Sequence, residues 1–475
     1  MKVVFVGGGA HRHLGILRGA MARKPIFDRG EIVLHDLNQP RAEAMGRMVM
    51  KTPEFAALSC KVTWDASLER ALDGADAVSV VLMAGSPRSF ALGSLASQKH
   101  GFMSSDQLSP NGAFLALKGG PILMGLARKM EKLCPDAWLI DFANPVAVLS
   151  AAVNNHTRIR CLGVCAGYQN HAWDLPRLMG RDELCHDFDL HVAGVNHLSF
   201  ILCGTFHGQD LYDLLAKHLT PKWRPPRYQP WWNTITKQNI TYGLRRLVEL
   251  FHKFGVVIFS TEGDGMAHLF YEQMQARNKT RLTRAGIEAG LEHGPKAREE
   301  ADRRFRAWLD RDLDADFWAN HWKTDFTFRR EDHDIIVKIL SALAGVGEEK
   351  IVASHPNRGA VDGFKDRTVL EYSQLLSKKR FRPALRQAQG AVSLPNRAGR
   401  YAIPDAFHGT ISALATHQTL LGDAIATEDP KTLYRALYAY PVQHNTRAAH
   451  ALYRDLLDIN RDEIPRAFQQ AKDYF

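Results

Sequence analysis

The stretch KVVFVGGGAHRHLGILRGAMAR, residues 2–23, decides the fold. Its first five residues predict a short β-strand, which ends directly at Gly7, Gly8 and Gly9. The residues that follow have the periodicity of a helix. Glycines between a strand and a helix let the backbone approach a pyrophosphate at the helix N-terminus. Arg12 stands where the dinucleotide-binding pattern G-x-G-x-x-G has its third glycine, so the motif is imperfect although its context is right.

Further strands alternate with helical segments along the first half of the chain. Residues 31–36, EIVLHD, predict a strand that ends at Asp36. An acid at this position binds ribose hydroxyls and repels a 2′-phosphate, so it favours NAD over NADP. Further strands are predicted at 75–83, 137–145 and 159–165. The alternation predicts an α/β fold with a doubly wound parallel sheet, and Met83, at the end of one strand, is included among the nucleotide-binding residues.

Length, charge and cysteine usage set the class of protein. A chain of 475 residues predicts two domains, here with a boundary near residue 195. The net charge is +10, but basic and acidic residues are mixed, as in 296–316, which is typical of a solvated helix rather than of nucleic-acid binding. No apolar run is long enough to span a membrane. Six cysteines and no signal-peptide pattern predict a cytoplasmic protein with reduced thiols.

Three polar residues follow predicted strands. Alone, Cys165 is explained as core filler, His197 as a buried histidine and Asn144 as a turn residue before a proline. Together they carry more information, because the strand ends of a doubly wound sheet converge on one crevice. A thiolate and an imidazole suit a divalent transition metal, and two protein ligands leave positions open for a substrate.

Motifs along nearly the whole chain resemble glycoside hydrolase family 4, the NAD- and divalent-metal-dependent glycosidases. They are VFVGGGA, DAWLIDFANPVAV, LGVCAGY, HVAGVNHLSF, FGVVIFSTEGDG and HPNRGAVDGF, in that order. The chain is most similar to the branch of α-glucosidases, α-galacturonidases and α-glucuronidases. The resemblance implies a Rossmann-like NAD-binding domain at 1–194. It also implies an α+β domain at 195–475 for metal, substrate and oligomerisation, in an architecture like that of lactate and malate dehydrogenases.

The resemblance also implies roles for single residues. In the family, the cysteine and histidine of these motifs hold the metal, usually manganese, which corresponds to Cys165 and His197. The asparagine before the proline contacts substrate and cofactor, which corresponds to Asn144. One branch has an aspartate directly after the metal-binding cysteine as general acid, whereas this chain has Ala166.

Three further residues are expected to contact the sugar. The turn TEGDGMAH, 261–268, is similar to the α-glucosidase branch, where an aspartate removes the C2 proton; this predicts Asp264 as base, with His268 as acid partner. Asp264 also lies between two glycines, where a turn aspartate needs no catalytic role. The segment SSDQLSPNG replaces a substrate-contacting loop and makes Asp106 the expected acceptor for a sugar hydroxyl.

The predicted activity is hydrolysis of an α-hexoside or α-hexuronide. The family chemistry implied is transient NAD-dependent oxidation at C3, metal-assisted elimination and addition of water, with NAD and Mn²⁺ or another divalent metal as cofactors. The expected partners are a glycoside, anionic if it is a uronide, and further copies of the chain in a homodimer or homotetramer. Two alternatives stay open: an NAD-dependent sugar or hydroxy-acid dehydrogenase, and an inactive NAD-binding sensor.

Overall fold

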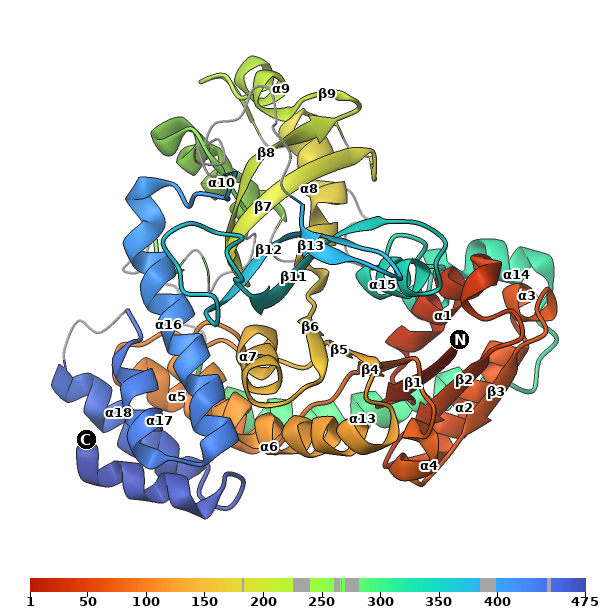
Figure 1. Ribbon diagram of the computed structural model, residues 1–475, viewed down its shortest axis with the longest axis horizontal. Coiled ribbons are helices and arrows are strands. Elements are labelled where there is room, and N and C mark those ends of the chain that lie inside the picture. The colour runs from red at the N-terminus through yellow and green to blue at the C-terminus, as the bar shows by residue number, and fades with distance from the viewer. Residues whose placement is uncertain are drawn as a thin grey trace.

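The computed structural model describes residues 1–181, 183–224, 240–259, 265, 267–269, 282–384, 399–441 and 446–475. Within these residues, one sheet contains thirteen strands, eleven of them in the order β10-β8-β7-β12-β11-β6-β5-β4-β1-β2-β3. Strand β13 pairs with β12, and β9 pairs with β8. Figure 1 shows this sheet running through the molecule from the N-terminal half to the second half.

The N-terminal part of the sheet is parallel and has the strand order of a Rossmann-like fold. Its strands are β1 (Lys2–Val6), β2 (Glu31–His35), β3 (Lys61–Trp64), β4 (Ala77–Val80), β5 (Trp138–Asp141) and β6 (Arg160–Gly163). Both faces are buried: Val3 and Phe5 belong to one core, and Val4 to another. The predicted fold class is therefore confirmed, and β3 is an additional strand.

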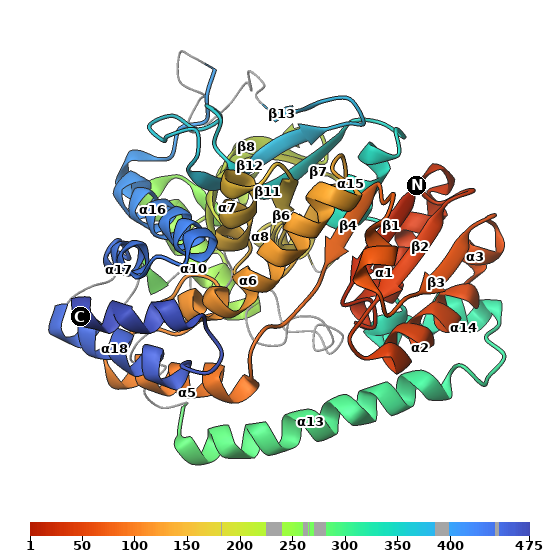
Figure 2. The ribbon, with the colours of Figure 1, turned by 60° about the horizontal axis from the view of Figure 1, so that its bottom comes forward.

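Helices connect these parallel strands and cover both faces of the sheet (Figure 2). They are α1 (Arg12–Ala22), α2 (Gln39–Met50), α3 (Pro53–Ala56), α4 (Leu68–Leu72), α5 (Pro87–Lys99), α6 (Pro110–Leu133) and α7 (Val146–His156). Polar caps determine where several begin. Ser109, for example, accepts the backbone N–H of Gly112 at the start of α6.

The second part of the sheet is antiparallel. It consists of β7 (Phe188–Val195), β8 (Leu198–Phe206), β9 (Gln209–Asp210), β10 (Val257–Phe259), β11 (Glu349–Pro356), β12 (Val369–Leu376) and β13 (Phe381–Pro383). It joins the parallel part where β11 pairs with β6, through the single register pair Ser354 and Gly163. The two halves of the chain thus share one sheet.

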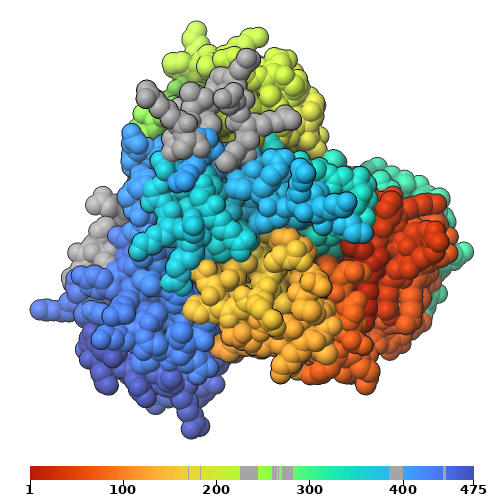
Figure 3. Space-filling view, viewed as in Figure 1, coloured from red at the N-terminus to blue at the C-terminus, as the bar shows by residue number. Residues whose placement is uncertain are grey.

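The remaining helices lie around both parts of the sheet. They are α8 (His171–Leu178), α9 (Leu211–His218), α10 (Ile240–Phe254), α13 (Arg284–Ala307), α14 (Ala315–Asn320), α15 (Ile335–Leu343), α16 (Asp405–Thr427), α17 (Pro430–Tyr438) and α18 (Thr446–Ile459). Helix α16 packs on α7 and α6, so that its surface borders theirs in Figure 3. Figure 2 shows α13 as a long helix extending along the N-terminal half.

Glycines of α1 allow a segment of the second half to pack closely on it. A Cβ at Gly15 would lie 2.5 Å from the carbonyl oxygen of Arg329, and a Cβ at Gly19 would lie 2.4 Å from that of Glu331. The nucleotide-type helix is therefore in direct backbone contact with residues more than 300 positions later in sequence. All six cysteines are free thiols. Among the described residues, no helix is long and apolar enough to cross a membrane.

Candidate active site

The glycine turn after β1 is held by the end of β2. Gly7 and Gly8 both donate their backbone N–H to His35 O, at 2.8 and 2.9 Å, and Gly9 donates to Asp36 Oδ2 at 2.9 Å. Gly7 has φ +80°, and a Cβ there would lie 1.9 Å from the carbonyl oxygen of Val81. Only glycine fits this position, so the turn has the tight geometry expected before a nucleotide-binding helix.

Two exposed apolar side chains flank this turn. Leu37, directly after Asp36, is 99% exposed, and Met83, in the loop after β4, is 64% exposed. Strands β2 and β4 are the two neighbours of β1 in the sheet. Apolar side chains that are exposed on both sides of a glycine turn can pack against the aromatic base of a bound dinucleotide. The base would then remove them from water. The predicted nucleotide-binding residues therefore lie at one edge of the sheet.

Arg12 and His11, at the N-terminus of α1, contact acids from the second half. Arg12 pairs with Asp334 at 2.9 Å and lies over the ring of Phe142, 3.8 Å from its centroid. His11 pairs with Asp302 of α13 at 3.1 Å. Burial lowers the pKa of His11, although Asp302 opposes this effect. The second half thus supplies carboxylates to the helix end that faces the predicted nucleotide site.

Asn144 and Asp106 lie together. Asn144 Nδ2 donates to Asp106 Oδ2 at 2.6 Å, and Gln107 Nε2 donates to Asn144 Oδ1 at 2.5 Å. Both ends of the Asn144 amide are therefore engaged, and this fixes which way the amide faces. The peptide bond between Asn144 and Pro145 is cis. These residues combine the end of β5 with the loop before α6.

The predicted metal ligands also lie together. Cys165, just after β6, and His197, in the turn between β7 and β8, have Sγ and Nε2 3.6 Å apart. The N–H of Gly167 donates to Cys165 Sγ at 3.4 Å. Sulfur and nitrogen ligands at about 2.3 and 2.1 Å from one metal ion lie about 3.1 Å apart at the 90° angle of an octahedral ion and about 3.6 Å apart at a tetrahedral angle. The pair therefore fits a divalent metal.

The predicted metal-binding pair shares its edge of the sheet with Asn144. Strands β5 and β6 are parallel neighbours, with Asp141 opposite Gly163, so Asn144 and Cys165 each follow the carboxyl end of a strand by two or three residues. Among the described residues, no third histidine, cysteine or acid completes a metal cluster. Two protein ligands with open coordination positions suit a metal that also binds substrate.

His268 is connected to the same region through Tyr440. The Tyr440 hydroxyl donates to Leu108 O at 3.1 Å, and His268 Nε2 lies 3.0 Å from the Tyr440 oxygen. Leu108 follows Asp106 by two residues, so this chain of contacts brings His268 toward the Asp106 loop. Asp264, the predicted base, lies outside the described residues.

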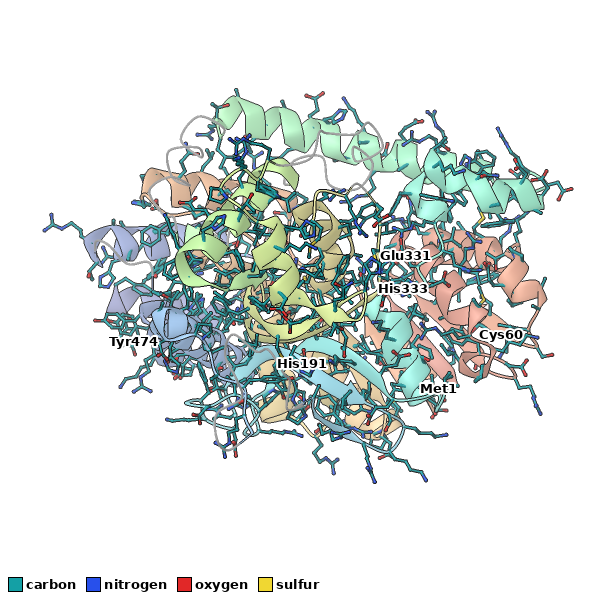
Figure 4. The ribbon with its side chains drawn as sticks, turned by 90° about the horizontal axis from the view of Figure 1, so that it is seen from above. Met1, Cys60, His191, Glu331, His333 and Tyr474 are labelled. Carbon is teal, nitrogen blue, oxygen red and sulfur yellow. The ribbon has the colours of Figure 1, made fainter. Side chains whose placement is uncertain are left out.

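A cavity of about 420 Å³ borders the turn after Cys165. Ala166 lines it together with Arg12 of α1 and with Glu331 and His333. Figure 4 labels Glu331 and His333, which lie close together between the two halves of the chain. Burial raises the pKa of Glu331. Ala166, at the position where one branch of the family has an aspartate, thus lines a cavity with other titratable groups.

Sequence reasoning missed several residues that the structure adds to this region. Gln107 was within the quoted loop SSDQLSPNG, and its position beside Asp106 was the available signal. Glu371 directly follows the apolar residues Val369 and Leu370 in β12, and this was the available signal for a buried acid. Asp302 lies in a strongly charged helix, 261 residues or more from its partners, and its sequence context contains no such signal.

Solved structures of two glycosidases have the same fold. One is a 6-phospho-alpha-glucosidase from gut microorganisms in complex with NAD and Mn²⁺, with a TM-score of 0.73, 17% identity, and coverage of 98% of each chain. The other is a 6-phospho-beta glucosidase from Thermotoga maritima with manganese, NAD⁺ and glucose-6-phosphate. Its TM-score is 0.71 at 17% identity, over 98% of this chain and 99% of that one.

Sequence relatives also match the full length. An alpha-galacturonidase of Thermoanaerobacter italicus is 23% identical, over 98% of this chain and 97% of that protein. An alpha-galacturonidase of Bacillus subtilis is 20% identical, over 96% and 97%. The family model of family 4 glycosyl hydrolases matches residues 2–180, and that of their C-terminal domain matches 192–442. These matches cover most of the chain and confirm the resemblance in its motifs: the protein belongs to family 4 of the glycosyl hydrolases.

Proposed function

We propose that this family 4 glycosidase hydrolyses an α-hexoside or α-hexuronide with NAD and a divalent metal, preferably Mn²⁺. The observation that carries the proposal is the distance of 3.6 Å between Cys165 Sγ and His197 Nε2, at the sheet edge that also bears Asn144. Two full-length relatives are named alpha-galacturonidase, which favours a uronide.

Each half of the site has a separate task. Gly7, Gly8, Gly9, Asp36 and Met83 would hold the dinucleotide, and Cys165 and His197 would hold the metal. When bound, these groups supply a hydride acceptor and a Lewis acid beside the sugar.

The residues of the chain then orient the sugar and move protons. Asn144, fixed by Asp106 and Gln107, presents its remaining hydrogen-bonding capacity to sugar hydroxyls. Asp106 is the second hydroxyl acceptor. Asp264 is the proposed base at C2, and His268, held by Tyr440, is its acid partner and the next candidate for the base.

The decisive experiment is a panel of aryl α- and β-glycosides and glycuronides, assayed with and without NAD and Mn²⁺ in deuterated water. We expect cleavage of an α-glycoside that requires both cofactors, and deuterium at C2 of the product. A conventional glycosidase with two carboxylates never breaks the C2–H bond. Rapid cleavage without C2 deuterium would contradict the proposal, and accumulation of NADH without cleavage would favour the dehydrogenase alternative.

The metal is tested by Cys165→Ser. A hydroxyl is a much poorer ligand for a borderline-soft metal than a thiolate. We expect the variant to keep its fold by circular dichroism, to lose bound Mn²⁺ and to lose activity. Full activity of Cys165→Ser in chelator-treated buffer would remove the metal from the proposal.

A further inference from the structure

The metal-binding histidine lies in an unusual turn. Strands β7 and β8 are joined by only two residues, Asn196 and His197, because Val195 pairs with Leu198. His197 has φ +68°, a left-handed conformation that non-glycine residues adopt only when surrounding contacts hold them. Both residues of the turn are buried, with exposed fractions of 0% and 6%. The contacts that hold this turn therefore decide where the imidazole lies.

Glu371 of β12 makes these contacts on both sides of His197. Its Oε1 accepts a hydrogen bond from Asn196 Nδ2 at 2.9 Å, and its Oε2 accepts one from Ser199 Oγ at 2.8 Å. The side chain is 2% exposed. One carboxylate thus binds the residue before the histidine and a residue just after it.

A glycine makes this reach possible. Glu371 lies opposite Gly194 of β7, and Gly194 lies opposite Ser199 of β8, so the three residues form one row across three strands. Gly194 has no side chain, which leaves the space that the Glu371 side chain needs to cross β7. A Cβ on Gly194 would lie 2.4 Å from Ser199 Cα, so a residue with a side chain would clash with β8 at this position.

We propose that Glu371 is a positioning residue for the metal centre, which holds the turn so that the His197 imidazole faces the Cys165 thiolate. This inference rests on the proposed metal-binding role of that pair. Within the described part of the chain, no arginine or lysine forms an ion pair with Glu371. A buried carboxylate that is not paired with an arginine or a lysine also favours a divalent cation nearby, so Glu371 has both a geometric and an electrostatic effect.

Two variants separate these effects. Glu371→Gln keeps the shape and one acceptor oxygen but removes the charge. Glu371→Ala removes both hydrogen bonds and leaves the Asn196 and Ser199 donors unpaired. We expect the affinity for Mn²⁺, measured by calorimetry without substrate, to fall about 10- to 100-fold in Glu371→Ala and by a smaller factor in Glu371→Gln. With Co²⁺ as probe, the absorption band from the Cys165 thiolate should shift or weaken in both variants.

Ser373→Ala is the matched control. Ser373 lies two residues further along β12, is fully buried, and accepts the N–H of Val192 at 2.9 Å, away from the turn. We expect this variant to melt at a lower temperature but to bind Mn²⁺ and Co²⁺ as the wild type does. If Ser373→Ala weakened metal binding as much as Glu371→Ala, the effect of Glu371 would be general destabilisation, which would overturn the inference.

The remaining outcomes are also decisive. Wild-type metal affinity and an unchanged Co²⁺ spectrum in Glu371→Ala would overturn the inference while leaving the metal site intact. If Glu371→Ala does not fold, the Mn²⁺ affinity of Glu371→Gln alone tests the inference. An affinity equal to that of the wild type would overturn it. A wild-type protein that binds no divalent metal would refute the proposed function itself, together with this inference.

Discussion

His13 shows how a buried titratable residue in the helix-opening sequence AHRH affects stability. Its ring is fully buried and lies edge-on to Phe5, with 5.2 Å between the ring centroids. Burial lowers the pKa of His13 to about 4 from the ordinary value of 6.5. Between these two values the unfolded chain binds a proton at this residue and the folded chain does not. The free energy of unfolding should therefore fall as the pH falls below 6.5.

His13→Leu should remove this dependence. In urea titrations at pH 7, 6 and 5, we expect the wild type to lose about 0.7 kcal/mol more than the variant between pH 7 and 6, and about 1.2 kcal/mol more between pH 6 and 5. His293→Leu is the control, because His293 is exposed in the folded protein. Equal slopes for wild type and His13→Leu would show that His13 is protonated in the folded state.

Among single residues of the candidate site, those that directly follow a strand could be recognised from the sequence. Asn144 and Cys165 were recognisable because each follows an apolar run, and the carboxyl ends of parallel strands meet at one edge. His197 also follows an apolar run, but its strand, β7, belongs to the antiparallel part of the sheet. Glu371 and Asp302 were not recognisable in this way. They reach the site from another strand and from a distant helix, and only the fold brings them there. Asp264 stays a prediction, since it lies outside the described residues.

Helix α13 is the element whose role was least visible in the sequence. Its Asp302 pairs with Arg41 of α2 at 3.2 Å as well as with His11. Arg41 lies five residues after Asp36, where an arginine can accommodate the 2′-phosphate of NADP. Since Asp302 binds this arginine and adds a negative charge, α13 should strengthen the preference for NAD.

Asp302→Asn should weaken that preference. We expect the dissociation constant of NADP⁺ to fall about tenfold relative to that of NAD⁺, which corresponds to ~1.4 kcal/mol of repulsion removed. Calorimetry with both nucleotides measures the ratio. Glu300→Gln makes the same change of charge at an exposed position of α13 and should leave the ratio unchanged. A similar shift in both variants would indicate a general charge effect instead.

Strands were predicted unevenly for a physical reason. Those of the parallel part are continuous apolar runs buried on both faces, and these are easy to recognise. Strands β11 and β12 contain histidine, serine, glutamate and glutamine among their buried residues, so their sequences lack a clear apolar pattern. Of these buried polar residues, Glu371 contacts the turn that carries His197.

On the scale of the whole molecule, the C-terminal segment supports the loop after β4. Both carboxylate oxygens of Glu463 accept the N–H of Ser86 at 3.2 Å, and Oε2 also binds Ser89 Oγ at 2.7 Å and Lys118 Nζ at 2.9 Å. Burial opposes ionisation, but these hydrogen bonds together lower the pKa of Glu463 to about 2. Met83 lies in the same loop, so the chain end helps to shape the proposed nucleotide site.

Glu463→Gln should weaken both stability and NAD binding. We expect a loss of about 1.5–3 kcal/mol in the free energy of unfolding at pH 7 and a several-fold higher dissociation constant for NAD. The stability difference should be present above pH 4.5 and shrink as the pH falls toward 2, because Glu463 has a lower pKa in the folded state. The exposed Glu428, replaced by Gln, is the control. Unchanged NAD affinity would separate Glu463 from the nucleotide site.

The shared sheet has a consequence for how the gene can be divided. Residues 1–194 expressed alone would carry β7 without its neighbours β8 and β12, and would lack Ser354 of β11, which pairs with Gly163 of β6. The face of α1 that Arg329 and Glu331 cover would also be bare. Open strand edges recruit strands from other molecules. A fragment of this protein would therefore be expected to form aggregates, and a chimaera with another family member should take α1 and residues 329–331, β6 and β11, and β7 and β12 from the same parent.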